Sequence, residues 1–226
     1  MGRTQRFMSS QLHDCSGCGT GESTSTGRVR LLVAAETEFA ERGYSGASIA
    51  GIARRAGVGK STVFHHFESK EALYLAVISR AAAEFAHTLE HVLSSSESVG
   101  EGLARFQAAH LDHMHRNAQV ARLILRELQD ERFGHDRPLI AEVLSANYTR
   151  LLRFLQSAQS RGEIRADADC EVAAIALFSA NVFHFQYAGA MARTPELTGA
   201  SDSGRFTQSI SDLVLNGLNA TESGSD

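Results

Sequence analysis

The fold is decided by residues 48–67, SIAGIARRAGVGKSTVFHHF, which read as two short helices joined by a tight turn. Ile49, Ile52 and Ala53 recur at the spacing of one helix face. Ser48 stands just before them, where its hydroxyl can accept from a free N–H of the first turn. The pattern therefore predicts a helix that begins at residue 49.

The turn is carried by Gly57, Val58 and Gly59. Two glycines allow the backbone to take positive φ and reverse direction within a few residues. Val58 is apolar and is expected to plug the small core between the helices. The second helix runs over 60–67, with Val63 and Phe67 facing inward at i and i+4.

A second helix packed in this way presents its polar residues outward and at its start. A helix-turn-helix with this presentation reads the major groove of DNA. The expected DNA-facing residues of this helix are Lys60, Ser61, Thr62, Phe64, His65 and His66.

The flanks extend the pattern, with a helix over 29–42 that ends at Gly43 and a new helix capped by Ser69. The run AETEFAERGYSGASIAGIARRAGVGKSTVFHHFESKEALYLAV resembles the TetR-type (TetR/AcrR) transcriptional regulators. The resemblance is close over about 27–79 and generic beyond. It implies an all-helical homodimer with an N-terminal three-helix DNA-binding domain and a C-terminal domain for dimerisation and ligand binding.

The resemblance also implies roles for single residues. Lys60, Thr62, Phe64 and His65 match positions that face the groove or the DNA backbone. Lys70 matches a lysine that contacts phosphate, and Ser48 matches a hydroxyl residue that approaches the backbone.

The chain departs from the family pattern at Gly59, where serine is usual, and at Phe64, where many members have tyrosine. Each change removes one hydroxyl, so both weaken backbone anchoring without breaking the fold. His66 has two interpretations of equal weight, which are DNA contact and partial burial against a neighbouring helix.

Composition places few limits on this interpretation. The chain has 226 residues and a mass of 24.4 kDa, and its formal net charge is −4. Residues 27–74 hold seven basic and five acidic side chains, so a mildly basic head is joined to an acidic body. No apolar run reaches the ~20 residues of a membrane span. Because no signal-peptide core is recognisable either, we expect a cytoplasmic protein.

Four segments are expected along the chain. They are a flexible arm (1–26), the DNA-binding domain (27–74), a helical effector-binding and dimerisation domain (75–219) and a polar tail (220–226).

The arm contains His13, Cys15 and Cys18, which could form a metal or redox site. A closed zinc site needs four ligands, so chance cysteines in a flexible tail are the favoured interpretation. Arg3 and Arg6 could also enter a minor groove, an option of low weight.

The body is expected to be all-α, with no alternating strand pattern. The periodicity predicts a long helix from Lys70 with a buried i+4 stripe. Further helices are predicted over about 99–115, 118–128, 138–161, 170–191 and 206–218, with a polar loop over 130–137 and a loop over 196–204.

The helices over 170–191 and 206–218 are too apolar for an ordinary surface. We expect them to pack against their copies in a four-helix dimer interface, although ordinary core is the alternative.

An apolar cavity for a small-molecule effector is expected between the body helices. Plain core is the competing interpretation for every candidate. The candidates are Phe85, Phe106, His110, Met114, Tyr148, Phe178, His184 and Tyr187.

Two histidine pairs have metal-ligand spacing, His87 with His91 and His110 with His113. If their helices are antiparallel, the pairs lie too far apart along the axis to share an ion. We therefore predict no metal and no cofactor.

The leading functional interpretation is a ligand-responsive regulator of transcription, expected to be a repressor that binds a palindromic operator as a homodimer. The alternative is a sequence-tolerant architectural DNA-binding protein without an effector. An enzyme is not expected, because no nucleophile–base pair, phosphate loop or complete metal set is present in the sequence.

Overall fold

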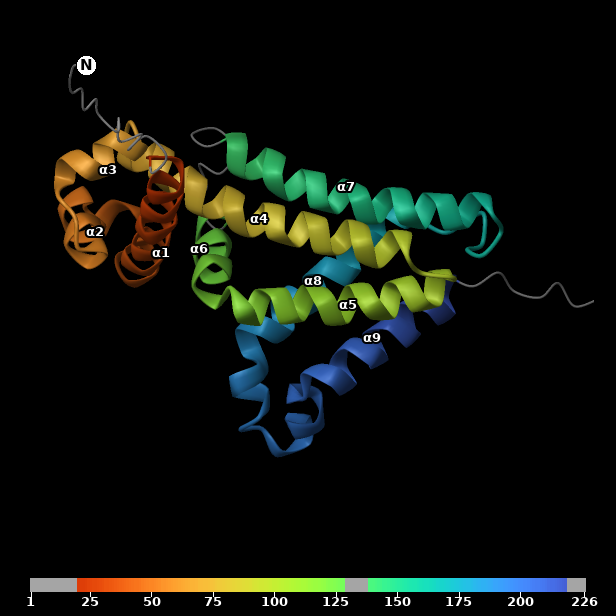
Figure 1. Cartoon of the computed structure of the whole chain (residues 1–226). Helices are drawn as coiled ribbons and strands as arrows, with labels where there is room; N and C mark the ends of the chain where they lie inside the picture. Colours follow the sequence, from red (N-terminus) through yellow and green to blue (C-terminus); the bar gives the residue numbers. More distant parts are fainter. Residues whose placement is uncertain (1–19, 129–137, 219–226) are drawn as a thin grey trace, which may run out of the picture.

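A computed structural model describes residues 20–128 and 138–218 (Figure 1), with no description of side chains at 20–25, 127 and 138–144. Within these residues the regular elements are helices and no β-strand is present, which confirms the all-α prediction. The predicted polar loop at 130–137 and the tail at 220–226 lie outside the described residues.

The head consists of α1 (Thr20–Gly46), α2 (Ile49–Ala56) and α3 (Lys60–His66), which gather at one end of the molecule (Figure 1). The predicted cap of α2 is confirmed, since Ser48 Oγ accepts from the Gly51 N–H at 3.0 Å. Gly57 ends α2 with φ of 69°. Gly59 has φ of −77°, so only the first of the two glycines uses its freedom to reverse the chain.

The first helix differs from the prediction at its start, since it begins at Thr20 rather than near residue 29. Its predicted end is confirmed, because the backbone leaves the helical conformation at Gly43 with φ of 68°, and a short helical stretch then continues to Gly46. Once a helix exists, each added residue contributes a hydrogen bond, and no proline interrupts 20–26. His13, Cys15, Cys18 and the arginines of the arm lie outside the described residues.

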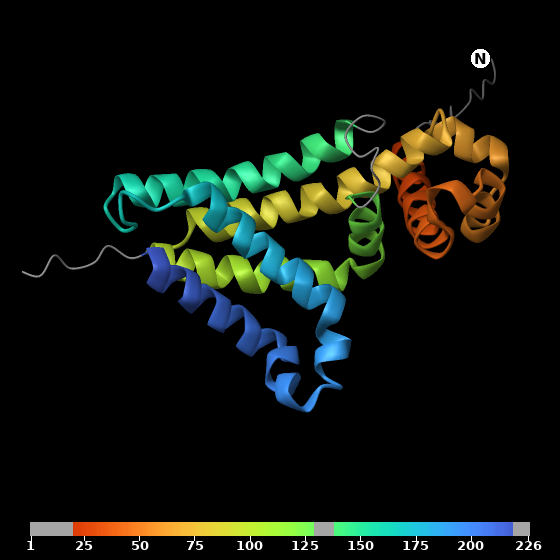
Figure 2. The same cartoon turned by 180° about the vertical axis from the view of Figure 1, so that it is seen from behind.

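The long helix α4 (Lys70–Ser94) leaves the head and runs through the body, where α5 (Val99–Arg116) and α7 (Pro138–Ser160) flank it (Figures 1 and 2). Its predicted stripe is buried, and the members are Leu73, Val77, Ala81, Phe85 and Leu89. Ser69 caps α4 by accepting from the Ala72 N–H. The short helix α6 (Ala118–Leu128) stands between body and head and packs against α1.

The last elements are α8 (Cys170–Met191), the 3₁₀ turn η1 (Pro195–Ser201) and α9 (Ser203–Leu218). Together α8 and α9 form a wedge with η1 at its tip, most clearly seen from behind (Figure 2). Part of the predicted loop over 196–204 is therefore η1. Because Asp202 Oδ1 accepts from the Arg205 N–H at 2.7 Å, α9 starts earlier than predicted.

Two hydrophobic clusters hold the described residues together. One joins the head to the first turns of α4 and to Val120 and Leu123 of α6. The other fills the body between α4, α5, α7, α8 and α9. No described helix is long and apolar enough to cross a bilayer.

Candidate nucleic-acid interface and internal cavity

The orientation of α3 is fixed by two buried anchors. Val63 is fully buried and Phe67 is nearly so, as predicted. The opposite face is therefore open, with the Phe64 ring 53% exposed. Lys60, Ser61 and His65 are also exposed, while Thr62 is half-buried.

His66 points back toward α1. It is half-buried, and a Cβ placed on Gly27 would lie 3.5 Å from His66 Nε2. Its ring also lies 5.3 Å from the His65 ring. The geometry favours packing over groove contact for this residue.

Most basic side chains of the head are engaged within the head. Arg30 Nη2 donates to the Ala56 carbonyl at 2.8 Å, at the end of α2. The Arg28 guanidinium lies 5.0 Å from the centre of the Phe67 ring. These cations stabilise the fold, so they are not free to approach a phosphate.

A buried carboxylate sits where α1 crosses α2. Glu38 is 2% exposed and is paired with Arg42 and with Arg55, each at 3.3 Å. A Cβ on Gly51 would lie 2.1 Å from Glu38 Oε1. A side chain at this position would therefore displace the Glu38 carboxylate from its paired position.

Lys70 is also engaged in the fold. Its Nζ donates to the carbonyls of Tyr44 at 2.9 Å and Ala47 at 3.2 Å, and it lies 4.4 Å from the centre of the Tyr44 ring. The ammonium thus ties the end of α1 to the start of α4. Two of its three protons are committed, a role that the resemblance did not suggest.

Lys60 and Arg54 differ from the other basic side chains of the head, which are engaged in internal contacts. Both are exposed, and neither side chain forms a hydrogen bond or ion pair with another residue in the described part of the chain. They flank the turn between α2 and α3. Arg54 was missed by the sequence analysis, although its place in the last turn of an exposed helix was a usable signal.

A cavity of about 450 Å³ opens between α4, α5, α6, α7 and α8. Its walls are mainly apolar, with a few neutral polar side chains. The described lining residues are Ala81, Ala82, Phe85, His110, His113, Met114, Asn117, Val120, Ala121, Ile124, Leu125, Leu128, Ser145, Asn147, Tyr148, Phe178 and Val182.

Five of the eight predicted ligand-contacting residues line this cavity, namely Phe85, His110, Met114, Tyr148 and Phe178. The other three lie elsewhere. Phe106 is fully buried behind the wall, with its ring 5.6 Å from that of His110. His184 is buried, and its ring centre lies 4.5 Å from that of Phe206. Tyr187 is 48% exposed on the outside of α8.

Two amides of the lining, Asn117 and Asn147, were not among the predicted residues. Asn117 stands at i+7 from His110 and at i+4 from His113, so one face of α5 carries all three. That periodicity was a usable signal. Asn147 adjoins the predicted Tyr148 and had no signal of its own.

Burial controls the charge of the two cavity histidines. Burial, with a smaller contribution from nearby His113, lowers the pKa of His110 to about 3. Burial also lowers the pKa of His113, aided by Arg116 and opposed by Glu84 and Asp112. Since desolvation disfavours the charged form, His110 is neutral at physiological pH.

The two histidine pairs lie in different environments. Among the described residues, no three His, Cys, Asp or Glu side chains are grouped so that they could hold an ion. His87 and His91 are exposed on α4, whereas His110 and His113 are buried.

Residues 31–77 match the family model described as bacterial regulatory proteins, tetR family. Together with the relatives named below, this match supports a TetR-type DNA-binding regulator of transcription. The chain is 36% identical over 97 residues to the transcriptional activator FasR of Mycolicibacterium smegmatis, a match over 43% of this chain and 44% of that protein.

A longer match is to the regulator UidR of Escherichia coli, at 29% identity over 62% of this chain and 70% of UidR. Among solved structures, FadR from Bacillus halodurans has a TM-score of 0.72 at 20% identity, covering 86% of this chain and 97% of that one. FadR from Bacillus subtilis in complex with stearoyl-CoA has a TM-score of 0.71 at 21% identity, covering 84% and 99%. At these identities the structures support the fold alone.

Proposed function

We propose that this TetR-type chain is a ligand-responsive repressor that binds a palindromic operator as a homodimer and is released by a small molecule. The observation that carries the proposal is the open face of α3, held outward by Val63 and Phe67 next to two uncommitted cations. Exposed polar residues on an anchored recognition helix are suited to reading base edges.

On this proposal Lys60 takes a phosphate or a guanine edge, and Thr62 and His65 contribute to readout. Ser61 offers a short donor at the start of α3, and the Phe64 ring packs on a sugar or a thymine methyl group. Ser48 Oγ already accepts from Gly51, which leaves its own proton for a phosphate. The third proton of Lys70 is left for the same purpose. A DNA contact is less expected of His66, because its ring packs toward Gly27.

We propose that α6 couples the cavity to the head. Val120 and Ile124 line the cavity and also pack in the hydrophobic cluster of the head. A ligand that fills the cavity would displace α6 and, through α6, the packing against α1. Coupling between two such sites is typically ~1–3 kcal/mol.

We propose that the outer face of α8 meets a second copy of the chain. Val172, Ile175, Phe183 and Tyr187 are each about half exposed on α8, and Leu213 on α9 is 68% exposed. Exposed apolar residues at helical spacing on two adjacent helices indicate an interface.

The effector is proposed to have a long apolar body, because the cavity wall is mainly hydrocarbon. A relative from Bacillus subtilis that is 26% identical over 153 residues is a fatty acid metabolism regulator, and FadR from Bacillus subtilis was solved with stearoyl-CoA. These names make acyl compounds the first class to screen. The architectural alternative predicts no effect of any such compound on DNA binding.

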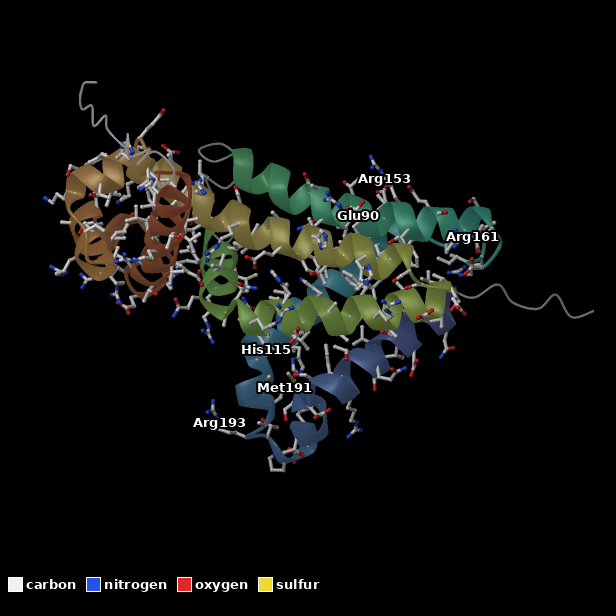
Figure 3. All side chains as sticks on the ribbon, in the orientation of Figure 1. Glu90, His115, Arg153, Arg161, Met191 and Arg193 are labelled. Carbon is white, nitrogen blue, oxygen red and sulfur yellow. The ribbon has the colours of Figure 1, made fainter. Side chains whose placement is uncertain are left out.

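The test is footprinting on DNA that flanks the chain's own gene, followed by fluorescence anisotropy with operator and random duplexes. Lys60→Ala and His65→Ala are expected to weaken operator binding at least tenfold. The control is Arg193→Ala, whose side chain lies near the tip of the wedge, remote from α3 (Figure 3). Equal, unchanged affinity of both variants for the operator would contradict the proposed readout.

A further inference from the structure

The two histidines of the cavity share one arrangement. In each ring, Nδ1 faces the amide nitrogen of an asparagine. Asn181 Nδ2 lies 3.1 Å from His110 Nδ1, and Asn117 Nδ2 lies 3.2 Å from His113 Nδ1. An amide NH₂ only donates, so each Nδ1 has to accept.

The orientation of each amide is fixed by a second acceptor. Asn181 Nδ2 also donates to the Gln107 carbonyl at 3.0 Å, and Asn117 Nδ2 donates to the His113 carbonyl at 3.2 Å. If either amide were turned over, its oxygen would face a carbonyl oxygen. The observed orientation is thus the only one that satisfies both contacts.

The proton of each neutral ring is consequently on Nε2. Each Nε2–H is a donor, and among the residues whose side chains the structure describes none accepts a hydrogen bond from it. Both rings line the cavity and flank Phe85, whose ring centre lies 5.0 Å from that of His110 and 5.1 Å from that of His113. The cavity therefore contains a pair of N–H donors beside an aromatic surface.

The polar side chains across the cavity from the two histidines do not change its hydrogen-bond-donor character. The Tyr148 hydroxyl donates its proton to the Glu171 carbonyl at 2.7 Å, and Asn147 Oδ1 accepts from Arg150. None of the described lining residues is Asp, Glu, Lys or Arg. An ionised ligand group would have to leave water without a counter-charge from these residues, which is costly.

We propose that His110 and His113 are specificity-determining residues that select an uncharged carbonyl oxygen on an apolar body, such as a ketone, ester or thioester. The proposal rests on the effector cavity of the proposed function and names the chemistry that it recognises. Asn181 and Asn117 are positioning residues, since they hold each imidazole in the donor tautomer. The low pKa of His110 agrees with this assignment, because a neutral ring has one proton to place.

The first measurement uses the full chain without ligand. Long-range ¹H–¹⁵N NMR spectra distinguish imidazole tautomers, and both rings are expected to be protonated at Nε2. Asn181→Leu removes the amide that fixes His110 and should leave that ring in a mixture of tautomers. A ring protonated at Nδ1 in the wild-type chain would overturn the proposal.

The second measurement is calorimetric titration at pH 7.5 with three probes of equal chain length: 2-nonanone, nonane and nonanoate. The ketone is expected to bind about tenfold more tightly than either of the others. His110→Phe and His113→Phe should each remove most of that preference while nonane binding persists. The control is His87→Gln, an exposed histidine of α4.

The outcomes separate this proposal from the proposed function. Nonanoate or nonane binding as tightly as the ketone overturns the carbonyl assignment, as does binding of no probe when the tautomers are as expected. In both cases a protected operator would still support a DNA-binding repressor. Selective ketone binding without any protected operator would support the carbonyl assignment and contradict the repressor.

Discussion

Acidification tests the burial of the cavity histidines directly. Burial lowers the pKa of His110 to about 3 in the folded chain, from the value of about 6.5 for an exposed histidine. Below pH 6.5 the unfolded chain binds a proton that the folded chain does not. The stabilising contribution is therefore fully present above pH 6.5 and is lost as the pH falls toward 3.

The size of the effect follows from proton linkage. Each titrating group changes the free energy of unfolding by at most about 1.4 kcal/mol per pH unit. His110 alone should therefore lower that free energy by about 2 kcal/mol between pH 7 and pH 5. The result is insensitive to the folded pKa as long as that pKa is well below 5. His113 and His184, whose pKa values are also lowered by burial, add in the same direction.

The assay is urea denaturation followed by circular dichroism at pH 7, 6 and 5, at one protein concentration because a dimer's stability depends on it. His110→Phe is expected to reduce the loss of unfolding free energy between pH 7 and pH 5 by about 2 kcal/mol. Glu163, with a lowered pKa, titrates below this window. Equal pH dependence in wild type and His110→Phe would refute the argument.

Three further predictions concern the head and the outer face of α8. Gly51→Ala drives a methyl group into the buried Glu38 carboxylate and should lower the free energy of unfolding by about 2 kcal/mol in urea denaturation, a cost of overpacking. Lys70→Ala removes two hydrogen bonds and should cost about 1–3 kcal/mol in the same assay, before any effect on DNA binding. Phe183→Glu together with Leu213→Glu should shift sedimentation toward a monomer at micromolar concentration, and an unchanged sedimentation coefficient would argue against the interface.

The local features of the head could be predicted from the sequence because their causes are local. The cap at Ser48, the reversal at Gly57 and the buried Val63 each depend on residues within one or two turns. Most helix bounds in the body were predicted for the same reason, and Gly162 follows the end of α7 with φ of 79°.

The uses of single side chains could not be predicted where the partner is distant in sequence. The carbonyls that Lys70 holds are 23 and 26 residues away, and the amide that fixes His110 is 71 residues away. Tyr187 and His184 had the composition of a cavity wall, but the rotation of α8 placed one outside and the other against α9. Periodicity defines a helix face without specifying which neighbour it meets.

The internal pairing of the head's cations has a consequence for how the protein finds its site. Affinity for DNA of any sequence comes from phosphates neutralised and counterions released, with a slope of about −0.9 in log K per contact. With Lys60 and Arg54 as the two uncommitted cations of the described head and one proton of Lys70 left for a phosphate, a dimer would neutralise about four to six phosphates and have a slope of about −3.6 to −5.4. Random genomic DNA would then retain it less strongly than it retains a protein whose basic side chains are all uncommitted.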